Sequence, residues 1–137
     1  MLLYPNTFLT KITDITIDFL ENNNIQGLIL DVDNTMIDYN RKPITGLEKW
    51  CNDLKSKNIK LCILSNSNKK EKVKTLAENL EIPFIYFACK PFKKGFLKSK
   101  RILGLENENI AVVGDQIFTD VLRCKQVKDV FHISRTS

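Results

Sequence analysis

The sequence predicts an α/β fold with three layers, built around a mostly parallel sheet. Two observations support this prediction. Short apolar runs that suit buried strands alternate with longer segments in which apolar residues recur every three or four positions, as in amphipathic helices. Strands joined through helices are parallel, because each connection is then a right-handed crossover. The whole chain, residues 1–137, fits a single domain.

Five strands are predicted, and the clearest begins at Gly27 and ends in two acidic residues, Asp31 and Asp33. Its apolar run, residues 28–30, is typical of a strand that is buried on both faces. The other predicted strands are residues 59–64, 83–87, 110–113 and 127–133.

Helices are predicted before and between these strands. Apolar residues spaced along residues 12–20 predict one helix before the first strand (Ile12, Ile15, Phe19 and Leu20). Pro43 precedes a second helical series from Ile44 to Leu54, and Asn68 with Glu71 resembles a capping box before a third helix. Residues 93–103 and 117–124 are the remaining predicted helices.

The composition disfavours membrane-spanning proteins and several hydrolase classes. No apolar run approaches the ~18 residues that cross a bilayer, and residues 1–10 lack the pattern of a signal peptide. Cysteines without a C-x-x-C pair favour reduced thiols and a cytoplasmic location (Cys51, Cys62, Cys89 and Cys124). The one histidine, His132, lies in an apolar segment that suits a packing or solvent-facing role, which disfavours a Ser-His-Asp triad or a poly-histidine zinc site. The net charge of +5 favours an anionic partner.

Polar side chains follow the predicted strands, at the edge of the sheet where ligands bind in open α/β folds. They are Asp31 and Asp33, then Ser65 and Asn66, then Lys90, then Asp115. Three carboxylates beside a phosphate dianion would repel one another strongly, and one lysine cannot compensate them. A divalent cation is therefore expected, and ligands that are all oxygen favour Mg²⁺ over Zn²⁺.

Simpler roles suit some of these residues. Residues 33–35 also fit a turn with a helix cap, Ser65 and Asn66 fit a loop before a helix, and Asp115 fits a turn. Lys93 and Lys94 are competitors for the position of Lys90. The occurrence of all four groups in order favours the chemical interpretation.

The four groups resemble the signature motifs of the haloacid dehalogenase (HAD) superfamily. The matching segments are Asp31-Val32-Asp33-Asn34-Thr35, Leu61 to Asn66, Lys90-Pro91, and Gly114-Asp115 with Asp120. The resemblance implies a Rossmann-like core and an Mg²⁺-dependent phosphatase that works through an aspartyl-phosphate.

The same resemblance implies a role for each residue. Asp31 is the nucleophile, Asp33 the general acid and base, and Lys90 neutralises charge on the phosphoryl group. The phosphate-binding residues are Ser65, Asn66 and Thr35. The metal ligands are Asp31, Asp115 and the backbone carbonyl of Asp33, and Asp120 supports them. The role of Asp120 has an alternative, since an acidic residue also suits the start of a helix.

Two further details concern the substrate. The segments between Asp33 and Ser65 and between Ser65 and Lys90 are too short for a cap domain, and capless relatives act on large or surface-bound substrates. Residues 2–121 resemble the subfamily III group of YqeG-like proteins and phosphatidylglycerophosphate phosphatases, through details such as Leu3-Tyr4-Pro5-Asn6. The resemblance implies a lipid phosphomonoester as substrate. Five cations between Lys93 and Arg101 suit peripheral contact with an anionic lipid at the inner membrane face, or simply a solvated helix face.

Three alternatives remain open at this stage. One is a signalling receiver domain, although its acidic pair would precede the phosphorylated aspartate by a strand and a helix. Another is a HAD-fold binding or regulatory protein that has lost activity, because the chain diverges from the group after residue 121. The third is a phosphatase that acts on nucleic acids or phosphoproteins.

Overall fold

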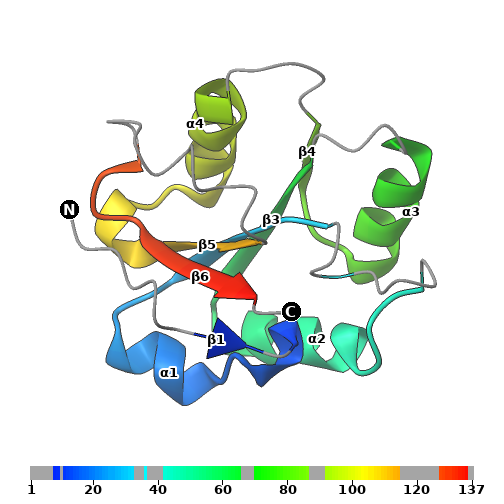
Figure 1. Ribbon diagram of the computed structural model, residues 1–137, viewed down its shortest axis with the longest axis horizontal. Coiled ribbons are helices and arrows are strands. Elements are labelled where there is room, and N and C mark those ends of the chain that lie inside the picture. Colours follow the sequence, from blue (N-terminus) through cyan, green and yellow to red (C-terminus); the bar gives the residue numbers. More distant parts are fainter. Residues whose placement is uncertain are drawn as a thin grey trace.

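The computed structural model describes residues 8–9, 11–32, 36, 42–65, 70–86, 92–114 and 127–135. They contain one sheet of six strands, β1 (Phe8–Leu9), β2 (Gly27–Leu30), β3 (Lys60–Ser65), β4 (Phe84–Tyr86), β5 (Ile110–Gly114) and β6 (Phe131–Arg135). The strands lie in the order β1-β6-β5-β2-β3-β4, and all neighbouring strands are parallel (Figure 1). The predicted α/β fold with a parallel sheet is therefore confirmed.

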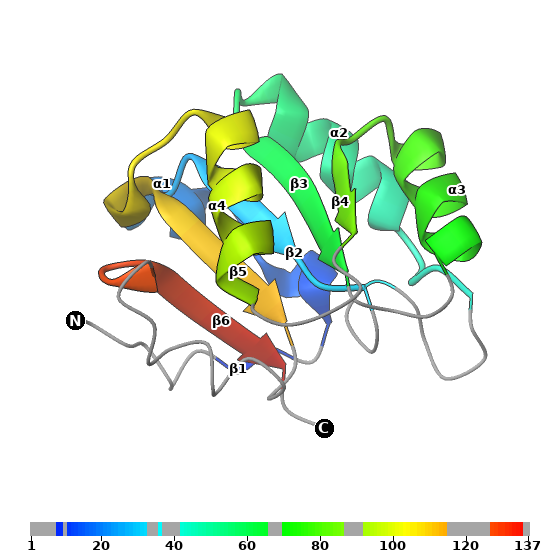
Figure 2. The ribbon, with the colours of Figure 1, turned by 90° about the horizontal axis from the view of Figure 1, so that it is seen from above.

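Helices cover both faces of this sheet. They are α1 (Ile17–Asn22), α2 (Leu47–Ser56), α3 (Lys70–Leu80) and α4 (Phe92–Leu103), with the 3-10 turns η1 (Ile12–Asp14) and η2 (Asn107–Asn109). Figures 1 and 2 show α4 on the face opposite to α1 and α2. Each face has its own apolar core: Leu28 and Ile63 pack beneath α2 and α3, whereas Ile29 and Cys62 pack against Phe96 and Leu103 of α4. This arrangement is a Rossmann-like three-layer sandwich.

The alternation of side chains explains why β2, β3 and β5 read as continuous apolar runs. All four residues of β2 and all five of β5 are buried, because these strands have a helix layer on each side. In the described part of the chain, α2 and β3 are the only helix and strand between residues 36 and 65, and no cap domain is present there.

Two predicted elements differ from the structure, and a third element was missed. The helix predicted across residues 12–20 is two short pieces, η1 and α1, because the Thr16 hydroxyl accepts a hydrogen bond from the Phe19 amide (3.1 Å) and caps a new helix. The strand predicted from Val127 begins only at Phe131, after a turn. Strand β1 was not predicted at all. The helix predicted at residues 117–124 lies outside the described residues.

Two lysines hold the carboxyl ends of α3 and α4 in place. The ammonium of Lys55 donates to the carbonyl of Leu80 (2.7 Å), and that of Lys60 donates to the carbonyl of Leu103 (3.0 Å). Cations are favourable at these positions, because the last carbonyls of a helix have no partner within it and carry partial negative charge.

Strand order reverses between β2 and β5. From β2 the chain continues through β3 to β4 on one side, and then crosses back to β5 and β6 on the other side (Figure 2). Ligands of open α/β sheets bind at such a reversal, beyond the carboxyl ends of the strands. The residue that follows β2 at this point is Asp31.

Candidate active site

Asp31 lies directly after the central strand, with only 7% of its surface exposed. Its backbone amide donates to the carbonyl of Val113 in β5 (2.9 Å), which fixes the aspartate at the β2–β5 boundary. Its Oδ1 atom accepts a hydrogen bond from the amide of Val32 (2.8 Å). A carboxylate this deeply buried needs compensating polar contacts, and the backbone supplies one of them.

Ser65 ends the adjacent strand β3 and is 2% exposed. Because Leu30 pairs with Ile63, the residues that follow them reach the same edge of the sheet. Asp31 and Ser65 therefore stand at the ends of adjacent strands, at one edge of the sheet. The hydroxyl of Ser65 lies on the α3 side of the sheet, since Ile63 two residues earlier packs in that core.

The other predicted site residues lie outside the described part of the chain. These are Asp33, Thr35, Asn66, Lys90, Asp115 and Asp120. Gly114, the residue before Asp115, ends β5, and β5 is the strand beside β2. Among the residues that the structure describes, no cluster of three or more histidines, cysteines or acidic residues forms a metal site.

Other buried titratable groups are poor nucleophiles or bases. Burial raises the pKa of the Cys51 thiol to about 11, although the nearby Lys55 opposes this shift. Burial also raises the pKa of Cys62 and lowers that of His132. All three groups are thus held in their neutral forms near pH 7. His132 takes the packing role rather than the solvent-facing one, since it is buried in β6.

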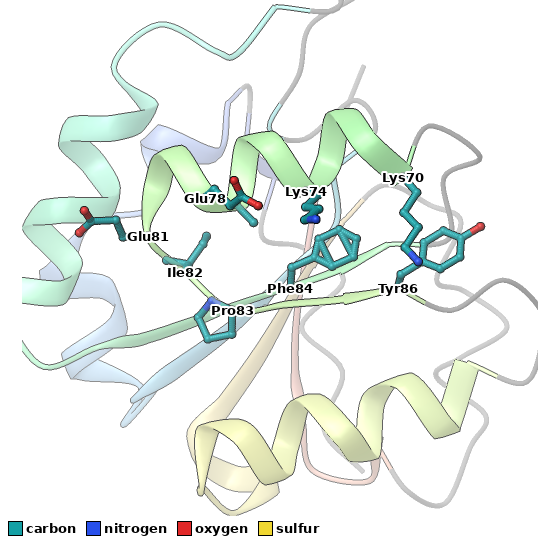
Figure 3. Close-up of a pocket in the computed structure, with 9 residues that line it drawn as sticks. Lys70, Lys74, Glu78, Glu81, Ile82, Pro83, Phe84 and Tyr86 are labelled. Atoms are coloured by element: carbon teal, nitrogen blue, oxygen red, sulfur yellow. The ribbon is translucent and has the colours of Figure 1, made fainter.

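A hollow of about 830 Å³ lies beside β4, the edge strand next to β3. We call it the β4 groove; its wall is α3, with Lys70, Lys74 and Glu78, followed by Glu81 just after the helix, and its floor includes Phe84 and Tyr86 (Figure 3). This groove was not predicted from the sequence. The available signals were the i, i+4 spacing of the two lysines and the alternation of two aromatic residues along a strand.

Comparison with known proteins identifies the family. Residues 1–130 match the family model described as mitochondrial PGP phosphatase. The chain belongs to this family. A Bacillus subtilis (strain 168) protein named "Probable phosphatase YqeG" is 41% identical over 119 residues, which are 86% of this chain and 69% of that protein.

Solved structures place this PGP phosphatase family member within the HAD fold. A Legionella pneumophila protein described as a HAD superfamily (subfamily III A) hydrolase has a TM-score of 0.60 at 19% identity, covering 86% of this chain and 78% of its own. A 3-deoxy-D-manno-octulosonate 8-phosphate phosphatase from Moraxella catarrhalis, in complex with magnesium and phosphate, has a TM-score of 0.57 at 18% identity. The match covers 89% of this chain and 84% of that protein. These likenesses show the HAD fold, and the family match with the Bacillus subtilis relative confirms the predicted group of YqeG-like and PGP phosphatases.

Proposed function

We propose that this phosphatase hydrolyses phosphomonoesters with Mg²⁺, through an aspartyl-phosphate formed on Asp31. The observation that supports the proposal is the position of Asp31, a buried carboxylate at the reversal of strand order, with Ser65 at the end of the adjacent strand β3. The remaining groups of the mechanism come from the sequence motifs.

The donor chemistry fits Mg²⁺. Asp31 is the first residue after β2, and Asp115 is the first residue after β5, the neighbouring strand. Two carboxylates therefore follow the ends of adjacent strands in the sequence. The carboxylates of Asp31 and Asp115 and the backbone carbonyl of Asp33 would hold the ion with oxygen atoms alone, which Mg²⁺ prefers. The bound ion would supply positive charge against the phosphoryl oxygens and the nucleophile.

The reaction divides into two displacements at phosphorus. A carboxylate oxygen of Asp31 forms a bond to phosphorus, the bond to the leaving oxygen breaks, and Asp33 gives that oxygen a proton. Asp33 then takes a proton from a water molecule, whose oxygen attacks phosphorus and breaks the bond to Asp31. Inorganic phosphate leaves and Asp31 is restored. Ser65, Asn66 and Thr35 orient the phosphoryl oxygens, and Lys90 neutralises their charge.

The experiment is hydrolysis of an aryl phosphate, with and without Mg²⁺. We expect activity that EDTA removes and Mg²⁺ restores, and no turnover by Asp31→Asn, because an amide does not accept the phosphoryl group. Asp53→Asn is a matched control, since Asp53 lies exposed on α2 and pairs only with Lys49 there. Beryllofluoride, which mimics an aspartyl-phosphate, should raise the melting temperature of the wild type and not of Asp31→Asn. Activity of Asp31→Asn equal to the wild type would refute the proposal.

Phosphatidylglycerophosphate is the leading candidate substrate. The family model carries the name of this substrate. In the part of the core that the structure describes, no cap would shield Asp31 from a surface-bound phosphate. The experiment compares kcat/KM on vesicles of this lipid, sugar phosphates, nucleotides and phosphorylated oligonucleotides. The proposal predicts the highest value on the vesicles. A preference for sugar phosphates or oligonucleotide ends would contradict it.

Helix α4 is the proposed contact with an anionic membrane. Leu97 and Ile102 are 40% and 45% exposed, and they are the exposed large apolar residues of the described chain. Lys94, Lys98 and Arg101 are exposed on the same stripe, at helical spacings of three and four residues. An outward stripe of cations with apolar residues between them suits the surface of an anionic bilayer. No described helix is long and apolar enough to cross a membrane.

Vesicle sedimentation tests this contact. Binding to anionic vesicles should fall with added salt, and should fall further in a Leu97→Gln/Lys98→Glu variant than in Lys72→Glu, which changes an exposed lysine of α3. Equal binding of both variants would exclude α4 as the contact.

A further inference from the structure

The β4 groove adjoins the predicted active site. Tyr86 is the register partner of Ser65, and strands of a sheet lie about 4.8 Å apart. Tyr86 and Ser65 share the α3 face of the sheet, because Phe84 and Ile63, two residues earlier in each strand, pack in the core beneath α3. Strand β2, which leads to Asp31, is the next strand beyond β3, so the end of the groove lies about two strand spacings, roughly 10 Å, from the nucleophile's strand.

This end of the groove is cationic. The ammonium of Lys70 lies 5.2 Å from the centroid of the Tyr86 ring, and Lys74 follows one helical turn later on the same wall (Figure 3). Like charges at this spacing repel each other. In the described part of the chain, no carboxylate lies within salt-bridge distance of Lys70 or Lys74, and the acidic residue of α3 that lines the groove, Glu78, follows Lys74 by one turn, away from Lys70. An anion between the two ammonium groups would relieve their repulsion.

The opposite end of the groove is anionic. Glu78 and Glu81 line it, together with Ile82 and Pro83 (Figure 3). Their carboxylates repel an anion, so a negatively charged ligand group is confined to the end beside Ser65. The rings of Phe84 and Tyr86 form an apolar floor between the two ends. The groove therefore favours a ligand whose charge lies near the catalytic centre and whose uncharged part extends along β4.

We propose that the β4 groove binds a second anionic group on the leaving group of the substrate, and that Lys70 and Tyr86 select for it. The inference rests on the proposed function, which places the reacting phosphoryl group at Asp31. The substrate class is a phosphomonoester whose alcohol carries a further phosphate or phosphodiester. The second phosphate binds between Lys70 and Lys74, and the carbon chain lies on the ring of Tyr86. A lipid headgroup and a soluble bisphosphate share this chemistry.

Equilibrium binding tests the site without turnover. In an Asp31→Asn background with Mg²⁺, we expect glycerol 1,3-bisphosphate to bind more tightly than glycerol 3-phosphate. Lys70→Gln should weaken bisphosphate binding about tenfold, the loss expected for one charge-assisted contact, and leave glycerol 3-phosphate binding within about twofold. Lys72→Gln is the matched control, because Lys72 is exposed on the same helix but does not line the groove.

Steady-state kinetics of the enzyme with Asp31 intact give a second measurement. Lys70→Gln should lower kcat/KM about tenfold on the bisphosphate and on phosphatidylglycerophosphate, and leave aryl phosphate hydrolysis within about twofold. Tyr86→Phe should keep selectivity and Tyr86→Ala should lose it, because the ring and not the hydroxyl faces Lys70. A loss on the lipid alone identifies the lipid headgroup as the ligand, and a loss on both substrates shows that a second phosphate suffices.

Two results separate this inference from the proposed function. If Lys70→Gln and Lys72→Gln weaken bisphosphate binding equally, or if Lys70→Gln slows aryl phosphate and bisphosphate hydrolysis equally, the groove is not the binding site. If bisphosphate binding depends on Lys70 while the wild type hydrolyses no phosphomonoester, the groove site stands and the proposed function is wrong.

Discussion

Trp50 donates its indole N–H to the backbone carbonyl of Ile15, 2.9 Å away and 35 residues earlier in the sequence. Both residues are buried in the core beneath α2, where Trp50 is 8% and Ile15 2% exposed. The bond joins α2 to the segment between η1 and α1, and it satisfies a carbonyl that a buried helix break leaves without a helical partner. It therefore supports the helix layer on the side of the sheet that carries Ser65.

Replacing Trp50 by Phe tests this bond. The variant keeps an aromatic ring but leaves the Ile15 carbonyl without its donor, so the free energy of unfolding should fall by about 1–3 kcal/mol. Urea unfolding measures the change. Lys49→Ala, on the exposed side of the same helix, should have little effect. Equal stability of Trp50→Phe and the wild type would show that the bond contributes nothing.

Ser65→Ala should lower phosphatase activity without unfolding the protein. Alanine fits the buried site, but it removes the hydroxyl predicted to bind a phosphoryl oxygen. One hydrogen bond to a charged group contributes about 1.5–3 kcal/mol, so kcat/KM should fall roughly 10- to 100-fold. Ser56→Ala is the control, since the Ser56 hydroxyl donates only to the Asp53 carbonyl at the surface (2.6 Å). An equal effect of the two substitutions on aryl phosphate hydrolysis would count against phosphate binding by Ser65.

Lys90→Ala should reduce kcat about 100-fold or more, because a preorganised charge aimed at the transition state is worth that much. Lys94→Ala should have a small effect, as Lys94 is exposed on α4. Lys93→Ala completes the series, since Lys93 also follows the third motif. Steady-state kinetics on an aryl phosphate measure all three. The largest loss in Lys93→Ala or Lys94→Ala would show that another lysine occupies the catalytic position.

The free energy of unfolding should decrease at acidic pH, because His132 is buried in its neutral form. Burial lowers the pKa of this histidine below its value of about 6.5 in the unfolded chain, so the unfolded state binds more protons between the two pKa values. The stability is fully present above about pH 6.5 and decreases as the pH falls toward the folded-state pKa. His132 is the one histidine of the chain, so His132→Leu should remove this component when unfolding is compared at pH 7 and pH 5. An unchanged pH dependence in His132→Leu would contradict this assignment.

The sequence predicted the centre of the sheet better than its edges. Residues 28–30 and 110–113 are apolar runs between two helix layers, and burial on both faces makes such strands recognisable without tertiary information. Strand β1 has two residues, too few for any periodicity, and it is ordered by pairing with β6. The start of β6 was placed too early because apolar residues at 127 and 130 belong to a turn, in which Asp129 has φ of 69°.

The strand-end residues of the site could likewise be predicted from the sequence, whereas the β4 groove could not. The motifs place Asp31 and Ser65 at strand ends, and parallel strand pairing is enough to bring such residues to one edge. The β4 groove depends on how α3 lies over β4, a packing relationship that no local pattern encodes. Lys70 and Tyr86 are 16 residues apart, and each alone reads as an ordinary surface residue.

Asp33→Asn should separate the two chemical steps. The amide neither protonates the leaving oxygen nor deprotonates water, so both displacements slow; with an aryl phosphate, whose leaving group needs little protonation, the second should slow more. The aspartyl-phosphate on Asp31 should then accumulate, and mass spectrometry of protein quenched in acid should detect one added phosphoryl group. Asp31→Asn/Asp33→Asn is the control and should carry none. If the wild type holds the phosphoryl group for many minutes and Asp33→Asn changes neither its amount nor its lifetime, Asp33 is not the general acid and base.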